Sequence, residues 1–498
     1  MSEQTNYSTL LSTKRFRQSE ISNRKIILES ESDRSRLVFS APFRRLQQKA
    51  QVFSLESNAA VRSRLTHSLE VAQVGRFLSE QIAIWLKNEN KATDEECRAF
   101  VNFVETACLM HDLGNPPFGH FGEAAIQEWF SQNGRNLLVV SLGLQKDPEN
   151  SHIASALGDF LEFDGNCQGL RIATKLQWNR DEFGLNLTHT TLAAFLKYLR
   201  SPKDSNEETK AKLFHKKPGF FDTEANLVKE IWSTFNYTEG PHRFPLAYVM
   251  EAADDIAYCI SDLEDSIEKE LISERFLFLD IYTKWSKQHI ENRDSCDITK
   301  LLSEANTEGC GDSFTFVDFR TRLSRLLTDQ AVKHYQENHE EILSGKSKSL
   351  LSEESNGGKI LEVLKNYCRK NVYSHYTVQQ IELSGYAAIR GLLEHFGILL
   401  SCSEERFTAA LNDTSRKDAN GKAIIIENKL LSLFPPKHIK VYKHAIKELK
   451  DNQTNNSDEY QFIEWNLRAH LITDFISGMT DDFAMQTFQN LSGIKTQL

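Results

Sequence analysis

The sequence predicts a mainly α-helical protein in which a helical core carries additional helical lobes and at most short β-hairpins. Apolar residues recur at helical spacing over long segments, whereas sustained alternation of period two is scarce. Only ten prolines interrupt a chain of 498 residues. Because this length exceeds what one hydrophobic core usually supports, we expect one large helical domain with appended lobes, or two fused domains.

Five segments carry the helical pattern. They span residues 66–88, 98–114, 244–272, 381–400 and 464–484. The first is amphipathic and is predicted to start near Thr66, although no glutamate follows three residues later to form a capping box. The second is almost entirely apolar, so it predicts a buried helix that ends at Gly114 and Pro116.

The sequence also indicates one possible β element and three loop segments. Residues 45–56 could form a short pair of strands, which is the one β element that the pattern allows. Three polar segments rich in glycine, asparagine and serine are predicted as surface loops or weak lobe boundaries. They span residues 346–359, 412–423 and 449–461.

The composition narrows the class of protein. Its 40% hydrophobic and 26% charged residues are typical of a soluble globular chain. A net charge of −10 argues against bulk attraction to DNA or membranes, but it does not exclude a local basic patch. The eight cysteines form no CxxC pairs, which favours reduced thiols over a zinc ribbon or a disulfide framework. No apolar run reaches about 18 residues, and the polar start lacks the core of a signal peptide. We therefore expect a cytoplasmic protein.

A possible metal site begins at the end of the second helix, where His111 and Asp112 are adjacent. A buried charge is costly, and a divalent cation would compensate for it. His67 on an earlier helix and Asp254 on a later one are candidates for further ligands, because imidazole and carboxylate donors together suit Mg²⁺, Mn²⁺, Fe²⁺, Co²⁺ or Zn²⁺. A His–Asp dipeptide alone is more often an ordinary surface or core pair.

The helix over 244–272 offers one polar stripe. At about 100° per residue, Asp254, Tyr258 and Asp262 fall within roughly 80° of one another. Such a stripe is usually a solvated acidic face, but the apolar segment FPLAYVMEAA just before Asp254 indicates that this end is buried. Asp255 is a rival ligand, which spacing alone does not exclude.

The stretch HDLGNPPFGHFGE combines glycines and two prolines, so it predicts a stiff turn that holds His120 at a fixed distance from the metal site. Glu123 follows one helical turn later, where its carboxylate can accept a hydrogen bond from the imidazole. A histidine oriented in this way is a good acid–base group near neutral pH. The alternative is a histidine that merely caps the start of a helix.

Five segments identify a family resemblance. They are ESDRSRLVFSAPFRRLQQKAQVFSLESNAAVRSRLTHSLEVAQVGR, HDLGNPPFGHFGE, EAADDIAYCISDLED, QIELSGYAAIRGLL and ISGMTD. Together they resemble the bacterial deoxyguanosine triphosphate triphosphohydrolases (dGTPases) of the HD superfamily, from about Glu31 to the GMTD motif near the C-terminus. The second segment is long and specific.

The resemblance implies a mainly helical fold and the hydrolysis of dGTP to deoxyguanosine and triphosphate, assisted by a divalent cation such as Mg²⁺ or Mn²⁺. It implies a symmetric homo-oligomer such as a hexamer. We expect an N-terminal arm over 1–30, an HD-type metal and catalytic core over 31–275, and a helical region over 276–498 that completes the nucleotide pocket. The metal ligands carried over from the family are His67, His111, Asp112 and Asp254, and the catalytic pair is His120 and Glu123.

A triphosphate needs basic groups concentrated locally in this acidic protein. The candidates are Arg44, Arg45, Lys49, Lys197, Lys216 and Lys217, although each alone is more often a surface residue. By resemblance, the sugar is expected to contact Gln51, Tyr258 and Asp262, and the phosphates to face Lys197, Tyr198 and Asn166.

The base requires a different partner. Guanine offers two N–H donors that one carboxylate can accept as a pair, which makes Glu382 the candidate, with Tyr373 stacking on the base. The alternative for Glu382 is a charge on a helix surface. The lysine-rich segment over 435–450 could face phosphates or form a groove for single-stranded DNA, but a solvated helix face is the favoured interpretation.

The favoured function is therefore metal-assisted attack of water at the α-phosphorus of dGTP. His120 would protonate the 5′-oxygen of the leaving group or accept the proton of the water. The sequence does not distinguish these two roles. One alternative is another HD-type nucleotide phosphohydrolase with broader dNTP or different nucleotide specificity. A second is a nucleotide- or single-stranded-DNA-binding module whose metal site is only structural.

Overall fold

The computed structural model describes residues 7–56, 58–146, 148–235, 242–288, 296–308, 314–412, 417–418, 421–452 and 457–494. Within these residues the fold is helical throughout, and β pairing is limited to three isolated bridges. The mainly α class that the sequence predicts is confirmed. Among the described residues, none of the helices combines the length and apolarity that crossing a lipid bilayer requires.

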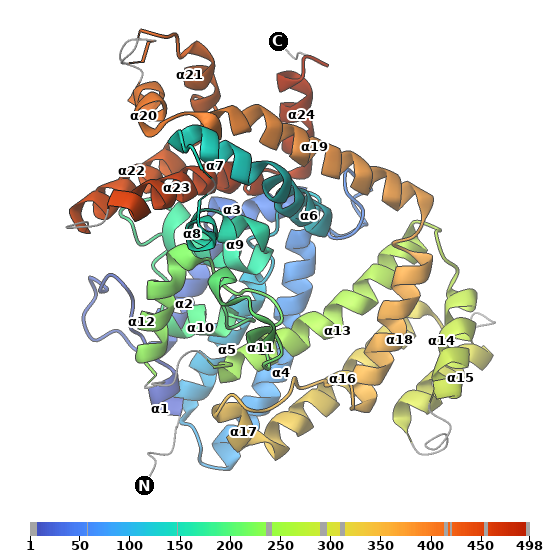
Figure 1. Ribbon diagram of the computed structural model, residues 1–498. Coiled ribbons are helices and arrows are strands. Elements are labelled where there is room, and N and C mark those ends of the chain that lie inside the picture. Colours follow the sequence, from blue (N-terminus) through green and yellow to red (C-terminus); the bar gives the residue numbers. More distant parts are fainter. Residues whose placement is uncertain are drawn as a thin grey trace.

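Three long helices form the centre of the molecule: α4 (Arg64–Asn88), α5 (Asp94–Met110) and α13 (Pro245–Glu268). They pack on one another because each buries a wide apolar face, and α10 (His189–Phe195) packs against both α5 and α13. All three long helices lie in the lower part of the molecule in Figure 1. The start of α4, the end of α5 and the middle of α13 line the cavity described below.

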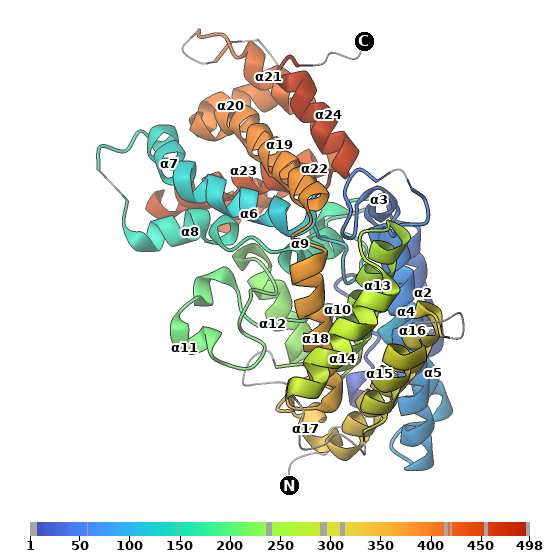
Figure 2. The same cartoon turned by 90° about the vertical axis from the view of Figure 1, so that its right-hand side faces the viewer.

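A second group of helices forms the upper part of the molecule in both views (Figures 1 and 2). It comprises α6 (Gly119–Trp129), α7 (Arg135–Leu142), α8 (Asn150–Leu161), α19 (Tyr376–Ser401), α22 (Pro436–Asn452), α23 (Ser457–Ser477) and α24 (Asp481–Leu491). Its hydrophobic core contains Trp129, Phe130, Phe396 and Trp465 and is separate from the core around α4, α5 and α13. The upper core draws on chain segments both before and after residue 275. The division into 1–30, 31–275 and 276–498 stays a prediction.

The remaining elements are short or peripheral. The α-helices are α1 (Tyr7–Leu10), α2 (Ile26–Val38), α3 (Ala41–Arg45), α9 (Gly165–Arg171), α11 (Glu207–Lys210), α12 (Ala225–Ser233), α14 (Glu274–Gln288), α15 (Asp297–Glu308), α16 (Phe316–Glu337), α17 (His339–Leu343), α18 (Asn356–Asn371), α20 (Glu404–Asn412) and α21 (Ile425–Leu431). Short 3₁₀ helices span Leu46–Gln48, Pro202–Asp204 and Asp222–Glu224, and π-helical turns span Phe130–Gly134 and Ile172–Leu176.

The start of α4 differs from the sequence prediction. The helix begins at Arg64, and Ser63 is its N-cap. Ser63 Oγ accepts a hydrogen bond from the backbone N–H of Thr66, while Thr66 Oγ1 accepts one from the backbone N–H of Ser63. A threonine thus closes a capping box that was not predicted from the sequence, because its hydroxyl can accept a hydrogen bond as a glutamate does.

Two further expectations need correction. The helix predicted over 464–484 is two helices, since α23 ends at Ser477 and Thr480 caps a new helix, α24, by accepting a hydrogen bond from the N–H of Phe483. No strand pair forms over 45–56 among its described residues, where a 3₁₀ helix is followed by a single bridge between Ala50 and Ser63.

The polar segments are only partly loops. Residues 356–359 begin α18, and the segment over 449–461 overlaps the end of α22 and the start of α23. Much of the segment over 412–423 lies outside the described residues.

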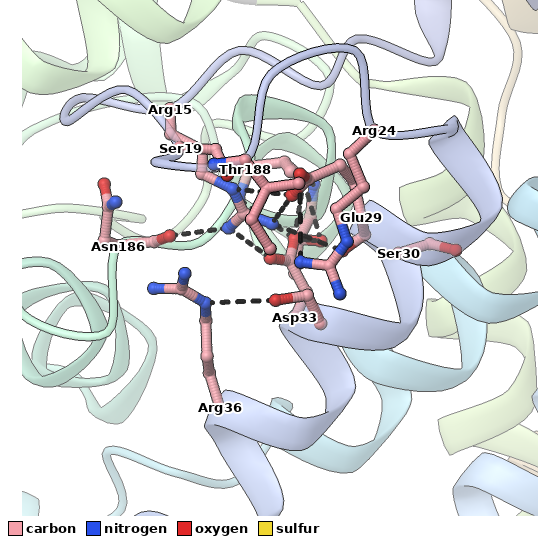
Figure 3. A network of polar contacts seen from close by, with 12 residues as sticks. Arg15, Ser19, Arg24, Glu29, Ser30, Asp33, Arg36, Asn186 and Thr188 are labelled. Atoms are coloured by element: carbon pink, nitrogen blue, oxygen red, sulfur yellow. Dashed lines mark hydrogen bonds and ion pairs between the residues drawn. The ribbon is translucent and has the colours of Figure 1, made fainter.

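The N-terminal segment is anchored by a buried polar network (Figure 3). The Arg15 guanidinium donates to Glu29, to Asp33 and to the carbonyl of Asn186. Asp33 also accepts from the backbone N–H and the hydroxyl of Thr188, the N-cap of α10. Arg15, Asp33 and Thr188 therefore hold one another in place. The network fixes the start of α10, and the chain that leaves α10 carries Lys197.

Candidate functional site

The predicted metal and acid–base residues line one cavity of about 680 Å³. Helix α4 supplies His67, the end of α5 supplies His111 and Asp112, and α13 supplies Asp254. The start of α6 supplies His120 and Glu123. Segments far apart in sequence meet here because the three long helices pack against one another.

The centre of the site is a cluster of His67, His111 and Asp254, whose potential ligand atoms all lie within 4.8 Å of one another. The Oδ1 atom of Asp254 is 3.6 Å from Nε2 of each histidine. The Nδ1 atom of His111 lies 2.8 Å from the carbonyl oxygen of Cys108. Because a carbonyl only accepts, Nδ1 carries the proton and leaves the Nε2 lone pair for a ligand.

The cluster fits a divalent cation. Nε2 of His67 and Nε2 of His111 are buried and have no hydrogen-bond partner among the described residues. Burial raises the pKa of the Asp254 carboxyl, but Lys197 and the two histidines outweigh burial and hold it well below its usual range. Two unpartnered buried imidazole nitrogens beside an ionised carboxylate are the donor set that Mg²⁺, Mn²⁺ or a similar ion can satisfy.

Asp112 lies at the edge of this cluster. Its Oδ1 atom is 3.6 Å from Nε2 of His111, and its Oδ2 atom accepts a hydrogen bond of 2.7 Å from Arg64. The side chain of Asn115 also donates to it. Burial alone would raise the pKa of Asp112, but Arg64 and the histidines lower it to about 2. The carboxylate is therefore ionised and beside the cluster, and its role as a ligand stays a prediction.

The two adjacent aspartates of α13 have different surroundings. Asp254 contacts the histidines through Oδ1 and Lys197 through Oδ2, at 3.2 Å. Asp255 instead accepts a hydrogen bond of 3.0 Å from Lys365 on α18. Spacing along the sequence left both open as ligands, and the geometry favours Asp254.

The two residues of the predicted acid–base pair are in direct contact. The Nδ1 atom of His120 donates to Oε2 of Glu123 at 2.8 Å, and Oε1 of Glu123 accepts from the backbone N–H of Gly165 at 2.8 Å. Both carboxylate oxygens of Glu123 are thus engaged, which fixes its orientation. This hydrogen bond raises the pKa of His120. The imidazole side chain is 80% exposed at the cavity, whereas Glu123 is buried.

The loop before His120 adopts an uncommon backbone conformation. Phe118 and Gly119 have φ values of 60° and 55°, both in the left-handed region. A Cβ atom on Gly119 would lie 2.7 Å from Nη2 of Arg64, the end of a long side chain, so it is mainly the positive φ that favours glycine there. This pair of residues turns the chain from the rigid Pro116–Pro117 segment into α6.

Most of the predicted substrate contacts line the same cavity. They are Gln51, Lys197, Tyr198, Tyr258 and Tyr373, together with Asn166, Lys216 and Lys217. Asp262 lies behind this wall and is fully buried. It accepts a hydrogen bond from the hydroxyl of Tyr373, which lies 2.9 Å from the hydroxyl of Tyr258. Burial raises the pKa of Asp262 to about 7.

Glu382 lies in an adjoining cavity of about 490 Å³, which also contains Gln379 and Leu383 of α19. The two cavities share Gln51, Arg64, His120, Tyr258 and Tyr373. Glu382 therefore lies on the far side of the shared wall from the metal cluster. Burial raises the pKa of its carboxyl to about 7.

Three candidate phosphate-binding residues are not brought to either cavity. Arg44 is exposed and donates to the carbonyl of Phe39, and Arg45 is half-buried elsewhere. Lys49 is buried and donates to the carbonyls of Asn115 and Ser477, so it braces the backbone. Lys49 thus holds the loop over 111–118, which we call the catalytic loop because it precedes His120, and composition could not show these partners.

The lysine-rich segment forms most of α22, which packs on α23. His438 and Tyr442 are buried, whereas Lys440, Lys443 and Lys447 are exposed. Neither cavity includes this segment among its lining residues.

Sequence reasoning missed several residues that line the cavity: Arg64, Asn115, Asp164, Lys365 and Arg369. Arg64 precedes His67 by three residues and so shares its face of α4, a spacing that could have identified it. Asn115 stands within the quoted HDLGNPPFGHFGE stretch. Lys365 and Arg369 lie one turn apart on α18 and belong to no motif.

Comparisons with known proteins point to one family. Residues 64–161 match the HD domain model. The chain is 37% identical over 488 residues to a protein of Yersinia pseudotuberculosis serotype O:3 (strain YPIII) named deoxyguanosinetriphosphate triphosphohydrolase, with 93% of each chain covered. Proteins of the same name from Enterobacter sp. (strain 638) and Yersinia enterocolitica are each 36% identical, and 97% and 93% of each chain are covered, respectively.

Proposed function

This chain belongs to the deoxyguanosinetriphosphate triphosphohydrolase family, and from that membership we propose how its cavity binds and hydrolyses dGTP. The protein is an HD-domain hydrolase that converts dGTP into deoxyguanosine and triphosphate. One observation carries the proposed mechanism: a single cavity joins the cluster of His67, His111 and Asp254 to the His120–Glu123 pair.

The enzyme uses a divalent cation, and we propose Mg²⁺ or Mn²⁺ held by His67, His111, Asp112 and Asp254. The unpartnered histidine nitrogens support this assignment. When bound, the cation stabilises negative charge on phosphate oxygens and makes water more acidic. Arg64 holds Asp112 ionised and in place, and Lys197 does the same for Asp254.

His120 is proposed as the general acid. Water attacks the α-phosphorus and loses a proton to the solvent, and the bond from this phosphorus to the 5′-oxygen breaks. The 5′-oxygen takes a proton from the imidazole, which regains one from the solvent after turnover. Because Glu123 raises the pKa of His120, the imidazole is protonated over a wider pH range than an isolated histidine. Its exposure at the cavity supports access to the leaving group.

The phosphates are proposed to lie against Lys197, Tyr198 and Asn166, with Lys217 close by. These groups provide local positive charge and hydrogen-bond donors in an acidic protein. Lys217 lies 3.2 Å from Asp164, so a phosphate would compete with that carboxylate for the ammonium group.

The sugar is proposed to contact Gln51, Tyr258 and the Tyr373–Asp262 pair. Oε1 of Gln51 lines the cavity and has no hydrogen-bond partner among the described residues, so it can accept a bond from a sugar hydroxyl. Asp262 lies behind the wall and would act through Tyr373, whose hydroxyl donates to it. The base is proposed to enter the adjoining cavity, where Glu382 would accept from the two N–H donors of guanine and Tyr373 would stack on its ring.

Product analysis tests the whole assignment. The purified protein is incubated with each of the four dNTPs and Mg²⁺ or Mn²⁺, and the products are separated by ion-exchange chromatography. We expect deoxyguanosine and intact triphosphate, with dGTP consumed fastest. Release of orthophosphate or pyrophosphate would instead indicate another HD-type phosphohydrolase, and no turnover with any nucleotide and metal would indicate a binding module.

We further propose a cytoplasmic homo-oligomer, such as a hexamer. The seven cysteines within the described residues carry free thiols, which supports a reducing compartment. Single-stranded DNA is a proposed partner of the exposed lysines Lys440, Lys443 and Lys447 on α22, because they follow one another at helical spacing. Light scattering and a salt-dependent DNA-binding titration test these two proposals.

A further inference from the structure

The turn between α23 and α24, residues 477–481, lies next to the catalytic loop although more than 350 residues separate them in the chain. The ISGMTD motif that contains this turn contributed to the family resemblance, but none of its residues has a role in the mechanism above. Its last residue, Asp481, is only 3% exposed.

Asp481 uses both carboxylate oxygens to hold backbone groups of the cavity wall. Oδ2 accepts a hydrogen bond of 3.0 Å from the N–H of Ala50, and Oδ1 accepts one of 3.1 Å from the N–H of Phe118. Ala50 immediately precedes Gln51, and Phe118 lies two residues before His120. One side chain therefore ties together the proposed sugar contact and the proposed general acid.

The backbone at Phe118 needs such support. Its φ of 60° is a conformation that bulky residues rarely adopt, and it persists only where the surroundings hold it. Asp481 holds the N–H from one side. On the other side, the ring packs on Gly385 of α19, where a Cβ atom would lie 2.3 Å from Cγ of Phe118.

A second contact joins the same two segments. The Lys49 ammonium donates to the carbonyl of Asn115 at 2.5 Å and to the carbonyl of Ser477 at 2.8 Å. The catalytic loop is thus fastened to the turn at Asn115 and at Phe118, on either side of the two prolines. A loop held at both ends has little freedom to move His120.

We propose that Asp481 is a positioning residue for hydrolysis. By holding the backbone at Ala50 and Phe118, it keeps Gln51 and His120 at a fixed distance from each other across the cavity. This inference rests on the proposed role of His120 as the general acid. A buried carboxylate that accepts from two backbone N–H groups cannot be replaced by an amide without loss, because the amide offers one acceptor and places an N–H against the second donor.

The test compares Asp481→Asn with Asp482→Asn, the same change at the exposed neighbouring position. For Asp481→Asn we expect kcat to fall by about 10- to 100-fold, as when an acid–base group moves by about 1 Å. KM for dGTP should rise by about 5-fold, the effect of one weakened hydrogen bond. Hydrogen–deuterium exchange should increase in peptides covering 47–53 and 114–121. Asp482→Asn should match the wild type in all three measurements.

A double-mutant cycle separates positioning from general destabilisation. If Asp481 acts through His120, the Asp481→Asn change should reduce kcat little further in a His120→Ala background. Independent, multiplicative losses would overturn the proposal, as would wild-type kcat in Asp481→Asn. Full activity of His120→Ala alone would instead refute the proposed role of His120.

Circular dichroism shows whether Asp481→Asn is folded. If this variant is unfolded, Thr480→Ala replaces it in the test, because Thr480 caps α24 and loss of the cap shifts Asp481 without removing it. We then expect a smaller fall in kcat and the same absence of a further effect in the His120→Ala background. Wild-type kcat in a folded Thr480→Ala protein would count against the proposal.

Discussion

Replacing Glu382 with glutamine should weaken hydrolysis of dGTP far more than that of the other deoxynucleotides. The carboxylate can accept from two N–H donors of guanine, whereas glutamine accepts with one oxygen and places an N–H against the second donor. A mispaired buried polar group costs on the order of 1–3 kcal/mol. Since 1.4 kcal/mol corresponds to a factor of ten, kcat/KM for dGTP should fall by about 5- to 150-fold.

The pH dependence gives an independent measurement of the same contact. Burial raises the pKa of Glu382 to about 7, so the carboxyl is ionised above that pH and increasingly protonated below it. Protonation turns one acceptor into a donor, so the preference of the wild type for dGTP over dATP should decrease from pH 8 to pH 6. The preference of Glu382→Gln should stay constant over this range.

The assay measures kcat/KM for all four dNTPs in the wild type, in Glu382→Gln and in Glu394→Gln. Glu394 lies three turns further along α19, outside both cavities, where it accepts a hydrogen bond from Trp129. Its replacement controls for the effect of removing a charge from this helix. An equal loss for every base in Glu382→Gln would refute the reasoning and place Glu382 outside the base pocket.

Four further predictions concern the proposed catalytic centre. Asp112→Ala should lose the bound cation and nearly all turnover while its helical content persists, and full metal occupancy by elemental analysis would contradict this. Asp254→Asn should lose metal in the same assay, whereas Asp255→Asn should retain it, because only Asp254 contacts the histidines. His120→Ala should lower kcat by roughly 10²–10⁴-fold with metal retained. Glu123→Gln should lower kcat less than His120→Ala does. It should also shift the alkaline fall of the pH–kcat profile to lower pH, because Glu123 raises the pKa of His120 and the general acid must be protonated.

Helices were predictable where local interactions decide them. The apolar pattern over 98–114 indicated a buried helix, and α5 spans Asp94–Met110 with nearly all of its later residues buried. The boundaries were less predictable, because a hydroxyl and a carboxylate can both close a cap, as Ser63 and Thr66 show at α4. The segment over 464–484 has continuous apolar content, but its helix breaks where Thr480 caps α24.

The sequence by itself determined the helical class and the family, and it predicted the residue types of the proposed catalytic centre, because these depend on local periodicity and on motifs contiguous in the chain. Only the tertiary structure separated Asp254 from Asp255, since a difference of about 100° around a helix matters only once neighbouring helices surround it. It also showed that Lys49, a candidate phosphate contact, instead donates hydrogen bonds to the backbone carbonyls of Asn115 and Ser477. The two hydrogen bonds of Asp481 span 431 and 363 residues, and no local pattern encodes a contact that forms only when distant segments pack together.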